Sequence, residues 1–121
     1  MNDKLGFEVD HTSGLIHVIG TGIWTVERAE THFRNLDRAV QNVRRKHGKV
    51  NVLVDLRGAA VQPSETAAVI HEWTTRIYRE ADRIAVVCAT SLLALQMRRG
   101  VNIAPLATFH EMEPALRWIN E

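Results

Sequence analysis

The sequence contains a single cysteine, Cys88, and only 3 prolines in 121 residues. One cysteine cannot form a disulfide within the chain, so we expect a hydrophobic core to hold the fold in a reducing compartment. The segment 1–10 is charged and lacks the apolar stretch of a secretory signal peptide. No apolar run approaches the roughly 20 residues that cross a bilayer. We therefore expect a cytoplasmic protein without a transmembrane segment.

The chain also lacks an excess of charge of either sign. Its 15 basic and 14 acidic residues are mixed along the sequence and leave a net charge of +1. Domains that bind nucleic acid or anionic membranes usually carry a basic excess, so we expect neither partner. Apolar residues make up 45% and charged residues 24%, as in soluble globular proteins. The length predicts one domain over residues 1–121.

Two kinds of apolar pattern predict strands. Near 7–10 and along "LIHVIGTG" (15–22), apolar and polar residues alternate on either side of a turn, which predicts an antiparallel hairpin. "VNVLVDL" (50–56) and "RIAVVCA" (83–89) are almost wholly apolar, as in strands buried on both faces. "ATF" (107–109) predicts a short edge strand.

The clearest helical pattern follows Thr25, the expected cap, and ends in a basic run before Gly48. Its expected inner stripe is Val26, Ala29, Phe33, Leu36, Val40 and Val43. After "VNVLVDL", the segment "RGAAVQP" (57–63) is expected to be a loop leading to a second helix.

Ser64 is the expected cap of this second helix. A third helix is expected to begin at Thr90 or Ser91 and to end near Gly100, and a fourth to run from about residue 112 to residue 120. The expected inner stripe of the second helix is Ala67, Ile70, Trp73 and Ile77.

The resulting order is β-β-α-β-α-β-α-β-α. Alternating strands and helices favour a mostly parallel sheet joined by right-handed crossovers. We therefore predict an α/β fold with a mixed, mostly parallel sheet of four to five strands, an N-terminal β-hairpin and four helices.

Four segments resemble one known family. They are "GIWTVERAE" (22–30), "GKVNVLVDLRG" (48–58), "ADRIAVVCAT" (81–90) and "ATFHEMEPALRWI" (107–119). They resemble a small bacterial branch of the STAS/SpoIIAA-like family, whose proteins have no known function and are related to the CRAL-TRIO-like lipid-transfer fold. The resemblance covers most of the chain and rests mainly on core and cap residues, so it implies a fold rather than a chemistry.

The better-understood STAS proteins are anti-sigma-factor antagonists with a phosphorylatable serine in an Asp-x-Ser-x-x-Gly-like segment. That segment corresponds here to residues 55–58. Asp55 matches, but Arg57 stands where the serine would be, and a guanidinium cannot accept a phosphoryl group in its place. Ser64 is the nearest hydroxyl, after a longer loop, and is the phosphorylation candidate that the resemblance leaves.

The same region predicts a ligand site, because open α/β sheets bind ligands beyond the carboxyl ends of their strands. Helix N-termini near Ser64 and Ser91 would offer N–H groups to an anion, and Arg57 a bidentate contact. Alternatively, Asp55 and Arg57 form a surface ion pair while the two serines are helix caps. The candidate ligand-binding residues are Asp55, Arg57, Gly58, Ser64, Trp73, Thr90 and Ser91.

The segment "LLALQMRRG" (92–100) has apolar residues on more than one helical face. With Trp73 and Tyr78 it would frame a hydrophobic pocket or a dimer contact, unless both faces pack within the domain. Arg98 and Arg99 lack an aromatic stacking platform, which favours a solvated helix end over a nucleic-acid patch.

The sequence contains no Gly-x-Ser-x-Gly, P-loop or Gly-x-Gly-x-x-Gly pattern. We expect Cys88 to be buried in a strand, with a raised pKa and little reactivity. The histidines do not take metal-ligand spacing with cysteines or acids; they are His11, His17, His32, His47, His71 and His110. We therefore expect no enzyme activity, catalytic residue, metal or cofactor.

Two hypotheses remain. One is a STAS-like regulatory or protein-interaction domain that contacts a protein partner or forms a homodimer. The other is a carrier or sensor of a small apolar, lipid-like or anionic ligand.

Overall fold

The computed structural model describes residues 3–99, 101, 103 and 105–121. The predicted order of strands and helices is confirmed. The elements are β1 (Leu5–Val9), β2 (Ile16–Gly22), α1 (Val26–His47), β3 (Asn51–Ala59), α2 (Ser64–Ile77), β4 (Arg83–Cys88), α3 (Ser91–Arg98), β5 (Leu106–Phe109) and α4 (Met112–Ile119).

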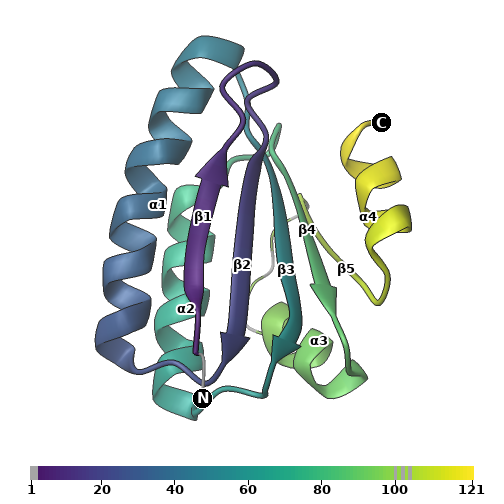
Figure 1. Cartoon of the computed structure of the whole chain (residues 1–121). Helices are drawn as coiled ribbons and strands as arrows, with labels where there is room; N and C mark the ends of the chain where they lie inside the picture. The colour runs from purple at the N-terminus through teal and green to yellow at the C-terminus, as the bar shows by residue number, and fades with distance from the viewer. Residues whose placement is uncertain (1–2, 100, 102, 104) are drawn as a thin grey trace.

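The strands form one sheet in the order β1-β2-β3-β4-β5. β1 is antiparallel to β2, and every later neighbouring pair is parallel. The helices α1, α2 and α3 lie on one face of this sheet, and α4 lies on the other, against β3, β4 and β5 (Figure 1). The predicted mixed, mostly parallel sheet with an N-terminal hairpin is therefore confirmed.

Strand alternation divides the apolar residues between two cores. Val52 and Leu56 of β3 enter the main core beneath α1, α2 and α3. Leu53 points to the opposite face and packs with Ala115 and Ile119 of α4. The central strands are buried on both faces, which explains why their sequences are almost continuously apolar.

Several predicted helix ends are confirmed. The Thr25 hydroxyl accepts a hydrogen bond from the N–H of Arg28 at 3.1 Å, which caps α1. Gly48 ends α1 with a φ of +81°, and its N–H donates to the carbonyl of Arg44. Thr90 caps α3 by accepting from the N–H of Leu93 at 3.2 Å. Gly100, expected near the end of that helix, lies outside the described residues.

The prediction that β3 ends before Arg57 is wrong. β3 continues to Ala59, because Thr21 and Gly22 of β2 pair with Gly58 and Ala59 beyond an irregularity in the register. The three-residue step from Asp55 to Gly58 lies opposite a two-residue step in β2, so β3 carries one extra residue, as at a β-bulge. Arg57 and Gly58 therefore belong to a strand rather than to a loop.

Two helix predictions are also corrected. Ser64 is the first residue of α2 and not its cap; Pro63 holds the cap position in an extended conformation, without a side-chain hydrogen bond. Val26 is exposed rather than part of the inner stripe of α1. The buried indole of Trp24 fills the core at that end of the helix instead.

Candidate functional site

Asp55 and Arg57 form an ion pair with each other on β3. Arg57 donates from Nε to Oδ1 and from Nη2 to Oδ2 of Asp55, each at 2.9 Å, and its backbone N–H donates to Oδ1 at 3.1 Å. These bonds from the Arg57 side chain are the main reason that the pKa of the Asp55 carboxyl is lowered. The guanidinium fork already holds a carboxylate, which is the arrangement that the ion-pair interpretation predicted.

Of the other predicted site residues, Thr90 and Ser91 follow the carboxyl end of β4, the parallel neighbour of β3, whereas Trp73 lies away from that edge. Trp73 packs between α1 and α2, where its ring stacks on Phe33 with centroids 6.4 Å apart and its Nε1 donates to Glu30 at 3.2 Å. The Thr90 hydroxyl is engaged as the cap of α3. Ser64 and Ser91 are the exposed first residues of α2 and α3. The residues at the carboxyl ends of β3 and β4 therefore share one edge of the sheet, Ser64 begins α2, and Trp73 lies in the contact between α1 and α2.

A shallow groove of about 340 Å³ runs between α2 and α3. Its most exposed apolar side chains are Leu92, Leu95 and Val61, which are 63%, 46% and 40% exposed. We call it the α2–α3 surface; its residues are Val61, Ser64, Ala67, Ala68, His71, Leu92, Leu95, Gln96 and Arg99. Of the two alternatives for the third helix, the structure shows the one in which part of its apolar surface stays uncovered, but Trp73 and Tyr78 do not line this groove.

A buried glutamine holds this surface in place. The backbone N–H of Gln62 donates to Oε1 of Gln96 at 2.8 Å, and Nε2 of Gln96 donates back to the carbonyl of Gln62 at 2.7 Å. The Gln62 side chain accepts from the N–H of Trp24 at 2.8 Å and donates to the carbonyls of Gly22 and Ala60. The loop before α2 is thereby tied to α3 and to the end of β2. Sequence reasoning missed Gln62, since a glutamine beside a proline resembles any polar loop residue.

A small, partly open cavity of about 60 Å³ lies between the sheet and the helices α1, α2 and α3. Its wall is almost entirely apolar, and its polar contributors are His32, Thr74 and Tyr78. Burial is the main cause that lowers the pKa of His32 to about 4, and burial also raises the pKa of the Tyr78 hydroxyl. An engineered cavity that admits benzene measures roughly 150 Å³. The cavity is therefore too small, as it stands, for a lipid chain.

The predicted burial of Cys88 is confirmed, and burial raises the pKa of its thiol to about 11. Within the described ranges, no three histidine, cysteine or acidic side chains come together as a metal site would require. The described helices also include none with the length and apolar character needed to cross a membrane.

The fold is similar to that of a protein whose structure has been solved. A crystal structure of an uncharacterised DUF3478-family protein from Shewanella loihica PV-4, described as having a SpoIIAA-like fold, superposes with a TM-score of 0.64. The two chains are 16% identical, and the match covers 96% of this chain and 92% of that one, so the likeness concerns the fold alone. No curated protein matches the chain. The SpoIIAA-like family model matches residues 15–120, and the chain therefore belongs to the SpoIIAA-like family.

Proposed function

We propose that this chain is a non-enzymatic protein-interaction domain of a regulatory kind, and that its contact site is the α2–α3 surface. One observation carries the proposal: three of the most exposed large apolar side chains of the described residues gather there. Leu92, Leu95 and Val61 surround a single groove instead of being scattered over the molecule. Isolated exposed aliphatic residues are ordinary, but a contiguous apolar patch with a polar border is typical of a protein contact.

The border of the patch and its rigidity support the same function. His71, Gln96 and Arg99 supply polar groups beside the leucines. His71 is itself hydrogen bonded to the carbonyl of Gln96 at 2.7 Å, which links α2 to α3 across the groove. A surface held by such bonds needs little rearrangement on binding, so less of the interaction free energy is lost to ordering.

Ser64 remains the phosphorylation candidate within this proposal. It is exposed at the start of α2 and lines the groove. A phosphoryl group there would bring about two negative charges to the border of an apolar contact, which would change the affinity for a partner. Incubation with lysate of the source organism and ATP, followed by peptide mass spectrometry, tests this idea. An unmodified Ser64 argues against it.

Site-specific crosslinking tests the proposed contact. A photoreactive benzoylphenylalanine at position 92 should capture a discrete protein, or a second copy of this chain, in cells of the source organism. The same group at Ile19, an exposed aliphatic on β2, is the matched control. Leu95→Arg should abolish the capture at position 92. Equal capture from both positions, or capture that persists in the Leu95→Arg variant, contradicts the proposal.

A carrier of a small apolar ligand is the second candidate function. The observation that favours it is the small, partly open cavity with its apolar wall and three polar groups. Since the cavity is small, this function requires α1 or α2 to move away from the sheet. Native mass spectrometry of protein purified from the source organism should then retain a lipid or metabolite adduct. A spectrum of the bare chain argues against the carrier.

A further inference from the structure

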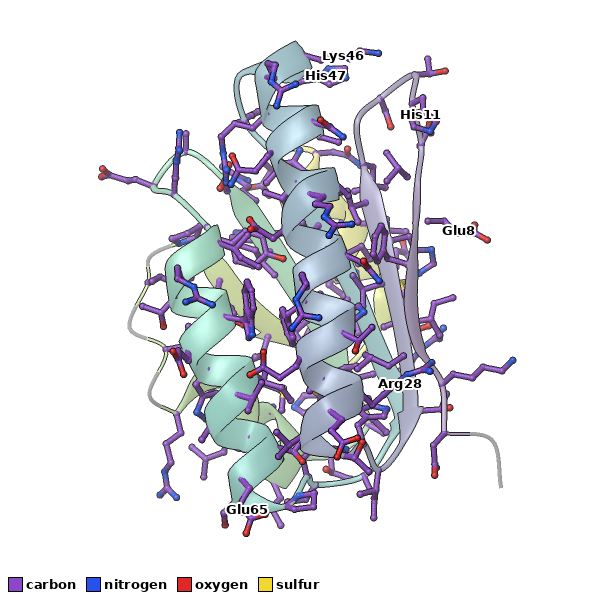
Figure 2. All side chains as sticks on the ribbon, turned by 90° about the vertical axis from the view of Figure 1, so that its left-hand side faces the viewer. Glu8, His11, Arg28, Lys46, His47 and Glu65 are labelled. Atoms are coloured by element: carbon purple, nitrogen blue, oxygen red, sulfur yellow. The ribbon has the colours of Figure 1, made fainter. Side chains whose placement is uncertain are left out.

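A cleft of about 380 Å³ lies at the opposite end of the molecule from the start of α2, between the β1–β2 turn and the last turns of α1. Figure 2 shows Lys46 and His47 at the end of α1 and His11 on the facing hairpin. The lining residues are Val9, His11, Gly14, Ala39, Asn42, Val43, Arg45, Lys46 and His47. The cleft therefore combines an apolar base with a polar rim drawn from two separate elements.

The rim is rich in nitrogen and contains no carboxylate. Arg45 and Lys46 contribute fixed positive charges, and His11, His47 and Asn42 can each donate a hydrogen bond. The nearest acids in sequence are Glu8 and Asp10, which flank Val9.

The Asp10 carboxylate accepts from the backbone N–H of Thr12 at 2.9 Å and of Ser13 at 3.3 Å. The backbone bonds to Ser13 and Thr12 are the leading causes of the lowered pKa of the Asp10 carboxyl. The same carboxyl also interacts electrostatically with His11, so it offsets part of the positive charge on the hairpin side, and Arg45 and Lys46 supply the positive charge of the helix side.

Close packing fixes the two walls of the cleft relative to each other. The His47 ring lies so near Gly14 that a β-carbon at Gly14 would approach its Cδ2 to 2.7 Å. Gly14 also has a φ of +80°, which only glycine adopts without strain in this setting. Val43, at the base, is buried in the main core. The site is therefore present in the unliganded fold.

Helix chemistry alone does not account for this arrangement. Basic residues in the last turn of α1 complement the negative end of the helix dipole, which explains Arg45 and Lys46. It does not explain His11 on a different element, or the apolar base formed by Val9 and Ala39. The volume lies within the roughly 300–1,000 Å³ that is typical of small-molecule sites.

We propose that this cleft binds a small organic anion. Arg45, Lys46 and the two imidazoles hold its carboxylate or phosphate, and Val9, Ala39 and Val43 contact its apolar or aromatic body. The cleft shares no residue with the α2–α3 surface, so a negative result for one proposal leaves the other unaffected.

Phenyl phosphate tests the proposal as a probe that carries both chemical features. In a titration followed by ¹H–¹⁵N correlation spectra, the amide signals of residues 10–15 and 42–48 should shift with saturation. Inorganic phosphate carries only the anionic group and benzyl alcohol only the aromatic ring. Each should therefore bind at least about tenfold more weakly than phenyl phosphate.

Two double variants with the same change of net charge sharpen the test. Arg45→Glu with Lys46→Glu should weaken phenyl phosphate binding about tenfold or more. Arg34→Glu with Arg38→Glu reverses two exposed charges on the same helix, outside the cleft, and should leave the affinity within about twofold.

Three results would overturn the proposal. They are shifts spread over the whole surface, equal weakening in both double variants, and an affinity for inorganic phosphate equal to that for phenyl phosphate.

Discussion

The buried ion pair between Arg44 of α1 and Asp82 before β4 allows a quantitative prediction. Their side chains are 8% and 1% exposed, and Nη2 of Arg44 lies 2.5 Å from Oδ2 of Asp82. Asp82 also accepts from the backbone N–H of Val50 at 2.9 Å and of Arg79 at 2.7 Å. Arg44 donates further to the carbonyl of Ile77 at 3.1 Å. One carboxylate thus joins α1 to the segments before β3 and β4.

Asp82→Ala should lower the free energy of unfolding by about 3–5 kcal/mol, because it leaves a buried guanidinium without its counter-charge. The two backbone N–H groups also lose their acceptor. For 121 residues this corresponds to a fall of about 12–20 °C in the melting temperature. Arg44→Met should cost less, since Asp82 keeps its two backbone donors. The double variant with Asp82→Ala and Arg44→Met should be at least as stable as Asp82→Ala, because it no longer buries an unpaired guanidinium.

Urea unfolding followed by circular dichroism at pH 7 measures all four proteins of this cycle. The coupling between the two substitutions should persist at high salt, because the pair is shielded from mobile ions. A loss below about 1 kcal/mol for Asp82→Ala would refute the reasoning. Strict additivity of the two single effects would refute it as well, because a true pair couples by more than about 0.5 kcal/mol.

Three other substitutions probe buried features of the fold. His32 is neutral in the folded state, with a pKa of about 4 against 6.5 when unfolded, so protonation of the unfolded chain removes stability as the pH falls between these values. The wild type should therefore lose about 3 kcal/mol more than His32→Leu between pH 7 and pH 4 in urea titrations; equal losses would argue against this origin. Gln62→Leu strands the N–H of Trp24 and should cost about 2–4 kcal/mol by thermal unfolding; a change below about 0.5 kcal/mol would show that the amide network is dispensable. Gly20→Ala places a β-carbon 2.5 Å from the Trp24 ring and should cost about 1–3 kcal/mol in urea titrations. The control Gly6→Ala, with open space around it, should change stability by less than about 0.5 kcal/mol, and equal effects at the two glycines would contradict the packing argument.

The sequence predicts the order of elements well because that order follows from local apolar periodicity. The stripe of α1 and the apolar runs of β3 and β4 can each be read within the segment that forms the element, without any contact from elsewhere in the chain. The end of β3 is different, because its last residues become strand only by pairing with Thr21 and Gly22 of β2. That pairing joins segments more than 30 residues apart. No local pattern near Arg57 encodes it.

The candidate sites show the same division between local and long-range information. The uncovered leucines of α3 correspond to one of the two alternatives that follow from counting apolar residues around one helix. The bonds between Gln62 and Gln96 join residues 34 positions apart, and the contact of Gly14 with His47 joins the hairpin to the end of α1. Polar residues that meet only in three dimensions carry no spacing signal. The sequence therefore predicts surface on single elements and misses sites built between elements.

The position of Arg57 bears on where regulation would act in this chain. The resemblance to STAS proteins aligns Arg57 with their serine, but here the residue lies within β3 and its side chain binds Asp55. Asp55 lies two residues after Leu53 on β3, so the two side chains share a face of the sheet. Leu53 packs under α4, and this face is the one away from α2 and α3. The substitution Arg57→Ser would thus place a hydroxyl beside Asp55 and not on the α2–α3 surface. Ser64, on that surface, is the residue at which a phosphoryl group would meet the exposed leucines.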